Sequence, residues 1–162
     1  MSTRCQVHVV QDGMWEDEVM LYHHSDGYPS HMIPILQKGF QLCTEPWISQ
    51  SNRVSYGKSW EAGRAGKSAA WMICADPGGF DVESGLELHG DIEYLYVVYC
   101  MNPEDGKYAW EVEVFAGFGE TVKDKRLLKR TNVMDIPKDL IENDLQLDMV
   151  MAIEDERKNA KV

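Results

Sequence analysis

Long hydrophobic runs are absent from this 162-residue chain, in which uninterrupted apolar stretches reach only seven residues over 69–75 and eight over 94–101. A membrane-spanning helix needs about 20 apolar residues, so the sequence predicts no membrane span. It also lacks internal repeats and low-complexity segments, which excludes collagen, coiled-coil and repeat architectures. Hydrophobic residues make up 44% of the chain and charged residues 27%, as in ordinary globular domains. We therefore expect a single domain over 1–162, with a frayed charged tail over about 155–162.

Basic residues are scarce: 16 lysines and arginines stand against 27 acidic residues, for a net charge of −11. Proteins that bind nucleic acid are usually basic, so direct nucleic-acid binding is not expected. The imbalance is concentrated in residues 81–121, which carry ten acidic side chains and one basic side chain, a net charge of −9. A strongly acidic surface either serves solubility or meets a partner of opposite charge.

Paired cysteine motifs are missing as well. The four cysteines are far apart and form no CxxC pair, which excludes a zinc ribbon or a small disulfide scaffold; they are Cys5, Cys43, Cys74 and Cys100. Their apolar neighbours predict four buried free thiols in a reducing compartment. The first residues, MSTR, lack the apolar segment of a secretory signal. We expect a cytoplasmic protein, in the cytoplasm of a bacterial host.

Two β-hairpins are the clearest structural signals. Residues 5–11 and 18–24 flank an Asp-Gly turn, and residues 91–101 and 107–115 flank a second turn rich in Asn, Pro and Gly. In the last strand, Trp110, Val112 and Val114 alternate with Glu111 and Glu113, which predicts one buried face and one that faces solvent. We expect this second hairpin at the centre of the sheet.

Helices are predicted over 30–40, with Ser30 as the N-cap, and over 58–75, ending at an Asp-Pro-Gly-Gly stop. Residues 44–56 read as a loop. A long final helix is expected after Asp135, which would cap it. The predicted fold class is α+β: one domain with a mainly antiparallel sheet of two β-hairpins, helices packed on one face, and a long C-terminal helix.

Histidines and carboxylates gather in two segments, HHSDGYPSH over 23–31 and HGDIE over 89–93. Imidazole and carboxylate groups can form an acid–base pair or hold a divalent metal. The catalytic candidates are His24, Asp26, His89 and Asp91, and the metal-ligand candidates are His24, Asp26, His31 and His89. The competing interpretation is that both segments are turns at which the histidines pack or lie exposed.

Residues 66–68, Gly-Lys-Ser, match the end of a phosphate-binding loop, but Glu61 stands where that loop requires its first glycine. A carboxylate there would repel phosphates, so we expect no nucleotide at this segment. Arg64 and Lys67 share a predicted helix face, and together with Arg4 they are the candidate anion-binding residues.

Three segments carry a family resemblance: Ser-Thr-Arg at 2–4, LYHHSDGYP at 21–29, and HGDIEYLY at 89–96. They resemble a group of small proteins, without a settled activity, found mostly in bacteriophage and prophage genomes. The resemblance covers about the first hundred residues and implies a phage origin. It also implies a shared site; the matching residues are Arg4, His24, Asp26, Gly27, Tyr28, Pro29, His89, Asp91 and Glu93. The group usually has an aromatic residue where this chain has Ser25.

Two functions follow as hypotheses. The first, which we favour, is a non-enzymatic accessory protein that binds, and thereby inhibits, a host or defence protein of the nucleic-acid-handling machinery. An acidic face would meet that partner's basic surface without a cofactor; the expected contact residues are Glu93, Glu104, Asp105, Glu111 and Glu113. The alternative is a metal-assisted or acid–base hydrolase, or a nucleotide-binding protein, with its site in 23–31 and 89–93 and a divalent metal as its cofactor.

Overall fold

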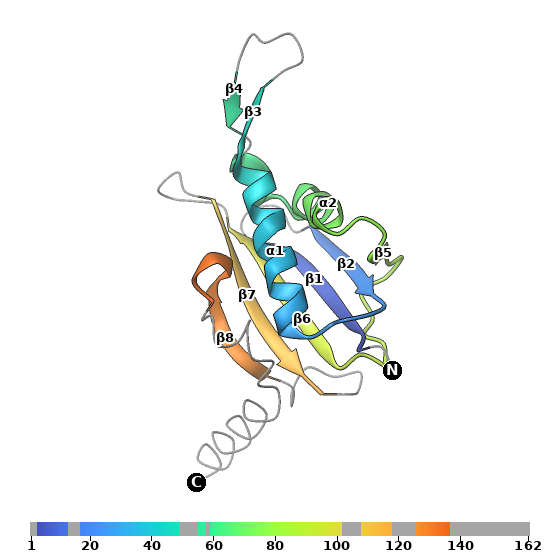
Figure 1. Cartoon of the computed structure of the whole chain (residues 1–162). Helices are drawn as coiled ribbons and strands as arrows, with labels where there is room; N and C mark the ends of the chain where they lie inside the picture. The colour runs from blue at the N-terminus through green and yellow to red at the C-terminus, as the bar shows by residue number, and fades with distance from the viewer. Residues whose placement is uncertain are drawn as a thin grey trace.

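A mixed six-stranded sheet with two α-helices forms the body of the computed structural model (Figure 1), which describes residues 3–12, 17–48, 55–57, 59–101, 108–117 and 126–136. The six strands are β1 (Cys5–Asp12), β2 (Glu18–His23), β5 (Phe80–Val82), β6 (Tyr94–Met101), β7 (Ala109–Ala116) and β8 (Arg126–Asn132). Their order across the sheet is β5-β2-β1-β6-β7-β8. The fold class is therefore α+β, as the sequence predicts.

Both predicted hairpins are confirmed. Strands β1 and β2 pair antiparallel with Cys5 opposite His23, and β6 and β7 pair antiparallel with Tyr94 opposite Ala116. The outer pairs β2–β5 and β7–β8 are also antiparallel, so the sheet is mostly antiparallel. The exception is the middle of the sheet, where β1 and β6 run parallel with Cys5 beside Tyr94. The second hairpin thus places β6, but not β7, at the centre.

The helices α1 (Pro29–Thr44) and α2 (Ala65–Ala75) lie over one face of the sheet (Figure 1). Helix α1 begins one residue earlier than predicted, because Pro29 occupies its first turn, where a missing N–H costs nothing. Tyr28 is therefore the N-cap, and the prediction of Ser30 is wrong. The helix also continues past residue 40, since Cys43 extends the buried stripe of Leu36 and Gly39.

Two further predictions need correction. Residues 58–75 are not one helix, because a short 3₁₀ helix, η1 (Ser59–Gly63), precedes α2 and Arg64 between them has an extended backbone. Glycine at the end of η1 weakens helix continuation at this point. The predicted loop over 44–56 holds β3 (Pro46–Ile48), which pairs with β4 (Ser55–Gly57). These strands are too short for an alternation pattern to reveal them.

The main core lies between the helices and the sheet. Trp110 is fully buried there, and its indole N–H is shared by the Ala62 carbonyl (3.1 Å) and the Ser68 hydroxyl (3.0 Å). Val112 and Val114 are buried on the same side, while Glu111 and Glu113 lie on the opposite face, so the predicted alternation is confirmed. Ser68 is thus a buried core residue, whereas Lys67 beside it is exposed.

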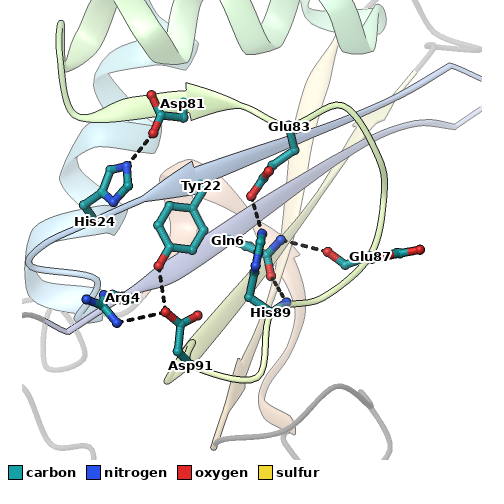
Figure 2. A network of polar contacts seen from close by, with 9 residues as sticks. All are labelled: Arg4, Gln6, Tyr22, His24, Asp81, Glu83, Glu87, His89 and Asp91. Atoms are coloured by element: carbon teal, nitrogen blue, oxygen red, sulfur yellow. Dashed lines mark hydrogen bonds and ion pairs between the residues drawn. The ribbon is translucent and has the colours of Figure 1, made fainter.

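A smaller apolar cluster occupies the other face of the sheet, which we call the open face. It comprises Tyr22, Ile92, Leu95, Val97 and Phe115. The connection from β5 to β6 crosses this face near Tyr22 (Figure 2). Because successive residues of a strand point to opposite faces, Tyr22 and His24 belong to the open face while His23 points toward the helices.

All four cysteines are free thiols, but their burial differs from the prediction. Cys5, Cys43 and Cys100 are buried, whereas Cys74 on α2 is exposed. Burial raises the pKa of the Cys5 thiol far above its usual range, and it raises the pKa of Cys100 to about 12. Cys5 and Cys100 are therefore packing groups in their protonated form.

The predicted C-terminal helix, the tail over 155–162, Glu104 and Asp105 lie outside the described residues. Asp135 itself belongs to a 3₁₀ helix, η2 (Val133–Asp135), whose N-cap is Asn132: its side-chain oxygen accepts from the Met134 N–H at 3.0 Å. Among the described residues, no helix is both long and apolar enough to cross a membrane.

Candidate functional site

The three segments that carry the phage-protein resemblance meet at one end of the sheet. The Gly27 N–H donates to the Thr3 carbonyl and the Glu93 N–H donates to the Arg4 carbonyl, each at 2.9 Å. The buried Tyr96 hydroxyl donates to the Gly27 carbonyl at 2.6 Å. Segments nearly ninety residues apart are therefore joined by backbone hydrogen bonds around the start of β1.

The Asp-Gly-Tyr-Pro segment is explained by this junction. Asp26 adopts a positive φ of 53°, which turns the chain out of β2, and aspartate tolerates that conformation better than most residues. Gly27 packs directly on β1, Tyr28 stacks edge-on against Tyr94 with ring centroids 5.8 Å apart, and Pro29 begins α1. Each residue of the segment thus has a structural role. Asp26 is exposed, as a turn residue at this point should be.

Tyr22 is the centre of a polar network on the open face (Figure 2). Its hydroxyl donates to Asp91 Oδ2 at 3.1 Å, and Arg4 Nη1 contacts the same oxygen at 2.8 Å. The rings of His24 and His89 stand edge-on to the Tyr22 ring, with centroid distances of 4.6 and 5.0 Å. Four of the predicted site residues, Arg4, His24, His89 and Asp91, are therefore brought together.

Both predicted catalytic histidines are hydrogen-bonded to carboxylates that the sequence reasoning missed. His24 pairs with Asp81 on β5, and His89 Nε2 lies 2.6 Å from Glu83 Oε1. Asp81 and Glu83 lie in a segment whose strand character was not predicted, so only their proximity in sequence to His89 could have suggested them.

The network also fastens the β5–β6 connection to the sheet. The Gln6 side chain donates to the Glu87 carbonyl at 3.0 Å and accepts from the His89 N–H at 2.9 Å (Figure 2). Gln6 is fully buried, so this pair of bonds satisfies an amide that would otherwise be costly to bury. These bonds hold the middle of the connection against β1.

Tyr22 acts as a hydrogen-bond donor. Burial raises the pKa of its phenol, and the hydrogen bond to Asp91 and the negative charge of that carboxylate raise it further. The phenol therefore stays protonated at neutral pH, which suits a structural donor and not a nucleophile.

A second cluster lies on the helix side of the sheet edge and contains His23, His31 and Asp76. One potential ligand atom from each residue lies within 4.8 Å of the others, and in the described part of the chain this is the one group of three that could hold a metal ion. Of the predicted metal candidates it includes His31; His24 and His89 lie instead on the open face, flanking Tyr22. His23 was missed because it is adjacent to His24, and the sequence pattern of β2 does not reveal which of the two histidines points toward the helices. Asp76 was recognisable only as a helix stop.

The glutamates of β7 are not free. Glu111 forms an ion pair with Arg130 at 2.7 Å, and the same guanidinium reaches Asp12 at 2.6 Å. Glu113 accepts a hydrogen bond from the Tyr99 hydroxyl at 2.5 Å. Part of the predicted acidic face is therefore neutralised by β8, whose Arg130 belongs to a stretch that the sequence pattern left unassigned.

The candidate anion-binding residues are not assembled at one place. Arg4 is engaged with Asp91 on the open face, whereas Arg64 and Lys67 are exposed at the start of α2 on the helix side. Comparison of the chain with protein families, with curated proteins and with solved structures finds no match.

Proposed function

We propose that this is a binding protein that docks residues 81–93, here called the acidic segment, onto a basic surface of a partner protein. The segment carries five carboxylates and no lysine or arginine; they are Asp81, Glu83, Glu87, Asp91 and Glu93. Asp81, Glu83 and Asp91 also pair with His24, His89 and Arg4, so the proposal rests mainly on Glu87 and Glu93. Glu111 and Glu113, whose partners are Arg130 and Tyr99, have a lesser role. The partner proposed is a host or defence protein that handles nucleic acid, which is the class that the resemblance to phage proteins favours.

The observation that carries the proposal is that the acidic segment is fixed in place before any partner binds. Its backbone is tied to β2 by the Glu83 N–H to Met20 carbonyl bond and to the residue before β1 by the Glu93 N–H to Arg4 carbonyl bond, both 2.9 Å. The Gln6 bonds hold its middle. A surface that is already ordered loses little conformational entropy on association, which favours affinity.

The acidic segment also offers apolar contact area between its charges. Leu86 is 45% exposed, which makes it one of the most exposed large apolar side chains among the described residues. Val82 is 64% exposed but stands opposite Leu21, so it belongs to the helix side of β5. Figure 2 shows the Glu87 carboxylate pointing away from the polar network. Apolar anchors surrounded by charges of one sign are typical of a protein-binding surface, where charge steers the encounter and apolar area holds the complex.

The test is capture of partners from bacterial lysate, followed by rate measurements on the captured protein. The variant Glu87→Lys with Glu93→Lys reverses two charges of the acidic segment. The control, Glu45→Lys with Asp135→Lys, makes the same change in net charge at exposed carboxylates outside it. We expect the control to capture the partner and the segment variant to lose it. Association of the parent should depend steeply on salt, and the segment variant should associate more slowly with a weaker salt dependence.

Circular dichroism must show both variants folded. The proposal is wrong if the parent captures nothing that the segment variant loses, or if both variants lose the same proteins to the same extent.

A further inference from the structure

We propose that His23, His31 and Asp76 form a binding site for a divalent transition metal, with Zn²⁺ as the ion that fits best. The three residues come from three elements: His23 ends β2, His31 lies in the first turn of α1, and Asp76 is the C-cap of α2. The site is on the helix side of β2, so it is separate from the acidic segment on the open face, and it stands independently of the proposed binding function.

The donor set matches the ion. Two imidazoles and one carboxylate are the protein ligands of many zinc sites, in which a fourth, open position is taken by water. Tetrahedral ligands about 2.0–2.2 Å from zinc stand roughly 3.4 Å apart. His23 Nε2 and Asp76 Oδ2 are now hydrogen-bonded at 2.6 Å, and the set of three spans at most 4.8 Å. Metal binding would replace that hydrogen bond and draw in His31, whose exposed ring is able to turn.

The ring of His23 is buried and held in place by its neighbours. Its side chain is 3% exposed, and its Nδ1 atom is buried without a hydrogen-bond partner among the described residues. Phe80 packs edge-on against the ring with centroids 4.9 Å apart, which fixes the ring plane. A buried ring held in this way keeps Nε2 aimed at Asp76, so little reorganisation is needed for an ion to bind there.

The backbone around the cluster favours a cation at this point. Asp76 sits at the C-terminal end of α2, where the helix dipole disfavours a carboxylate unless a positive charge lies beside it. A cation bound beside Asp76 would remove this unfavourable interaction at the end of α2.

The turn after α2 closes the site. A Cβ built on Gly79 would overlap Asp76 Oδ2 and lie 2.7 Å from His23 Nε2, so the backbone itself packs against the pair and a larger residue would displace it. The Gly79 N–H donates to the Asp76 carbonyl at 3.1 Å, which holds the turn in this position. The Asp-Pro-Gly-Gly segment therefore ends α2 and also holds Asp76 beside His23.

The experiment uses metal-free full-length protein in a Cys74→Ser background, because the exposed Cys74 thiol on α2 could bind zinc by itself. Zn²⁺ is titrated against a chromophoric chelator, and Co²⁺ absorption reports the coordination geometry. We expect one ion per chain, a rise in the thermal midpoint with Zn²⁺, and at least a 10-fold loss of affinity in both His31→Ala and Asp76→Asn.

His24→Ala is the matched control, since it removes a histidine paired with a carboxylate on the open face. It should bind Zn²⁺ as tightly as the parent. Because His31 is exposed, His31→Ala should fold, and its loss of metal binding is then a loss of a ligand. The proposal is overturned if the parent does not bind the ion, or if His31→Ala and His24→Ala bind it equally.

Discussion

Gly27 lies so close to Cys5 that a Cβ on the glycine would stand 2.9 Å from the Cys5 Cβ. The same Cβ would also meet the backbone of Arg4 at 3.0 Å. Gly27→Ala should therefore push the turn away from β1 and destabilise the fold by about 1–3 kcal/mol, as overpacking usually does. Urea denaturation followed by circular dichroism measures this loss.

Gly66→Ala is the control for that substitution. Gly66 lies in the first turn of α2, and nothing lies within 4 Å of a Cβ built there. Alanine is the better helix former, so this variant should be as stable as the parent or more stable by up to about 1 kcal/mol. Equal losses in the two variants would contradict the close approach of Gly27 to β1.

Trp110 should be the most costly aromatic residue to truncate. It is fully buried, and its N–H satisfies both the Ala62 carbonyl and the Ser68 hydroxyl. Trp110→Ala should cost on the order of 3–5 kcal/mol in the free energy of unfolding. Trp60, which is 46% exposed, provides the comparison: Trp60→Ala should cost less than about 1 kcal/mol. An unchanged denaturation midpoint for Trp110→Ala would show that the indole is not in the core.

The cysteines should react at two distinct rates. Cys74 is exposed, whereas the other three are buried, and burial raises the pKa of Cys5 and Cys100, which keeps those thiols from ionising. Alkylation of native protein followed by mass spectrometry should therefore show one fast modification, with the other three appearing only in denaturant. Cys74→Ser should remove the fast modification, and a second fast site would be inconsistent with this packing.

Alkaline pH should destabilise the protein, partly through Tyr22. The pKa of Tyr22 is raised above its ordinary value of 10.0, mainly by burial. Below pH 10 the phenol is protonated in both states, so its contribution to stability is complete. As the pH rises toward the folded-state pKa, the unfolded phenol ionises first, the unfolded state binds fewer protons, and stability is lost. The raised pKa values of Cys5 and Cys100 act in the same direction, beginning from about pH 9.

Tyr22→Phe separates the contribution of the Tyr22 phenol to the alkaline loss of stability from that of the cysteine thiols. The variant loses the hydrogen bond to Asp91, so its stability at pH 7 should fall by about 1 kcal/mol. Its further loss between pH 9 and pH 11 should be smaller than that of the parent, because one of the titrating groups is gone. Unfolding curves over this pH range test the prediction, and parallel losses in the two proteins would contradict it.

Local patterns predicted the hairpins well, because alternation around Trp110 and the Asp-Gly turn after β1 are short-range signals. The parallel contact of β1 with β6 could not be read from such signals, since it joins residues far apart in the sequence, such as Val7 and Tyr96, which share the core with the helices. Strand β5 has three residues and one paired neighbour, too little for a periodic pattern.

The site was predicted in part for a related reason. His23 and His24 are adjacent, and in β2 the apolar residues Met20, Leu21 and Tyr22 occupy both faces, so the pattern did not reveal which histidine points toward the helices. The direction in which His23 points depends on the pairing of β2 with β1, where Leu21 stands opposite Val7 on the helix side. Asp76 was recognisable as a helix stop, but its place beside His23 follows only from the packing of α2 against the sheet.

The parallel pairing of β1 with β6 has a consequence for how the chain folds. Each hairpin can form from neighbouring residues, but joining them through β1 and β6 closes a loop on the order of ninety residues, an entropic cost that local contacts do not offset in advance. The two halves of the sheet should therefore form first and associate late. A chain shortened from its N-terminus through β1 would lose the strand that joins them, leaving β2 with β5 on one side and β6 with β7 and β8 on the other.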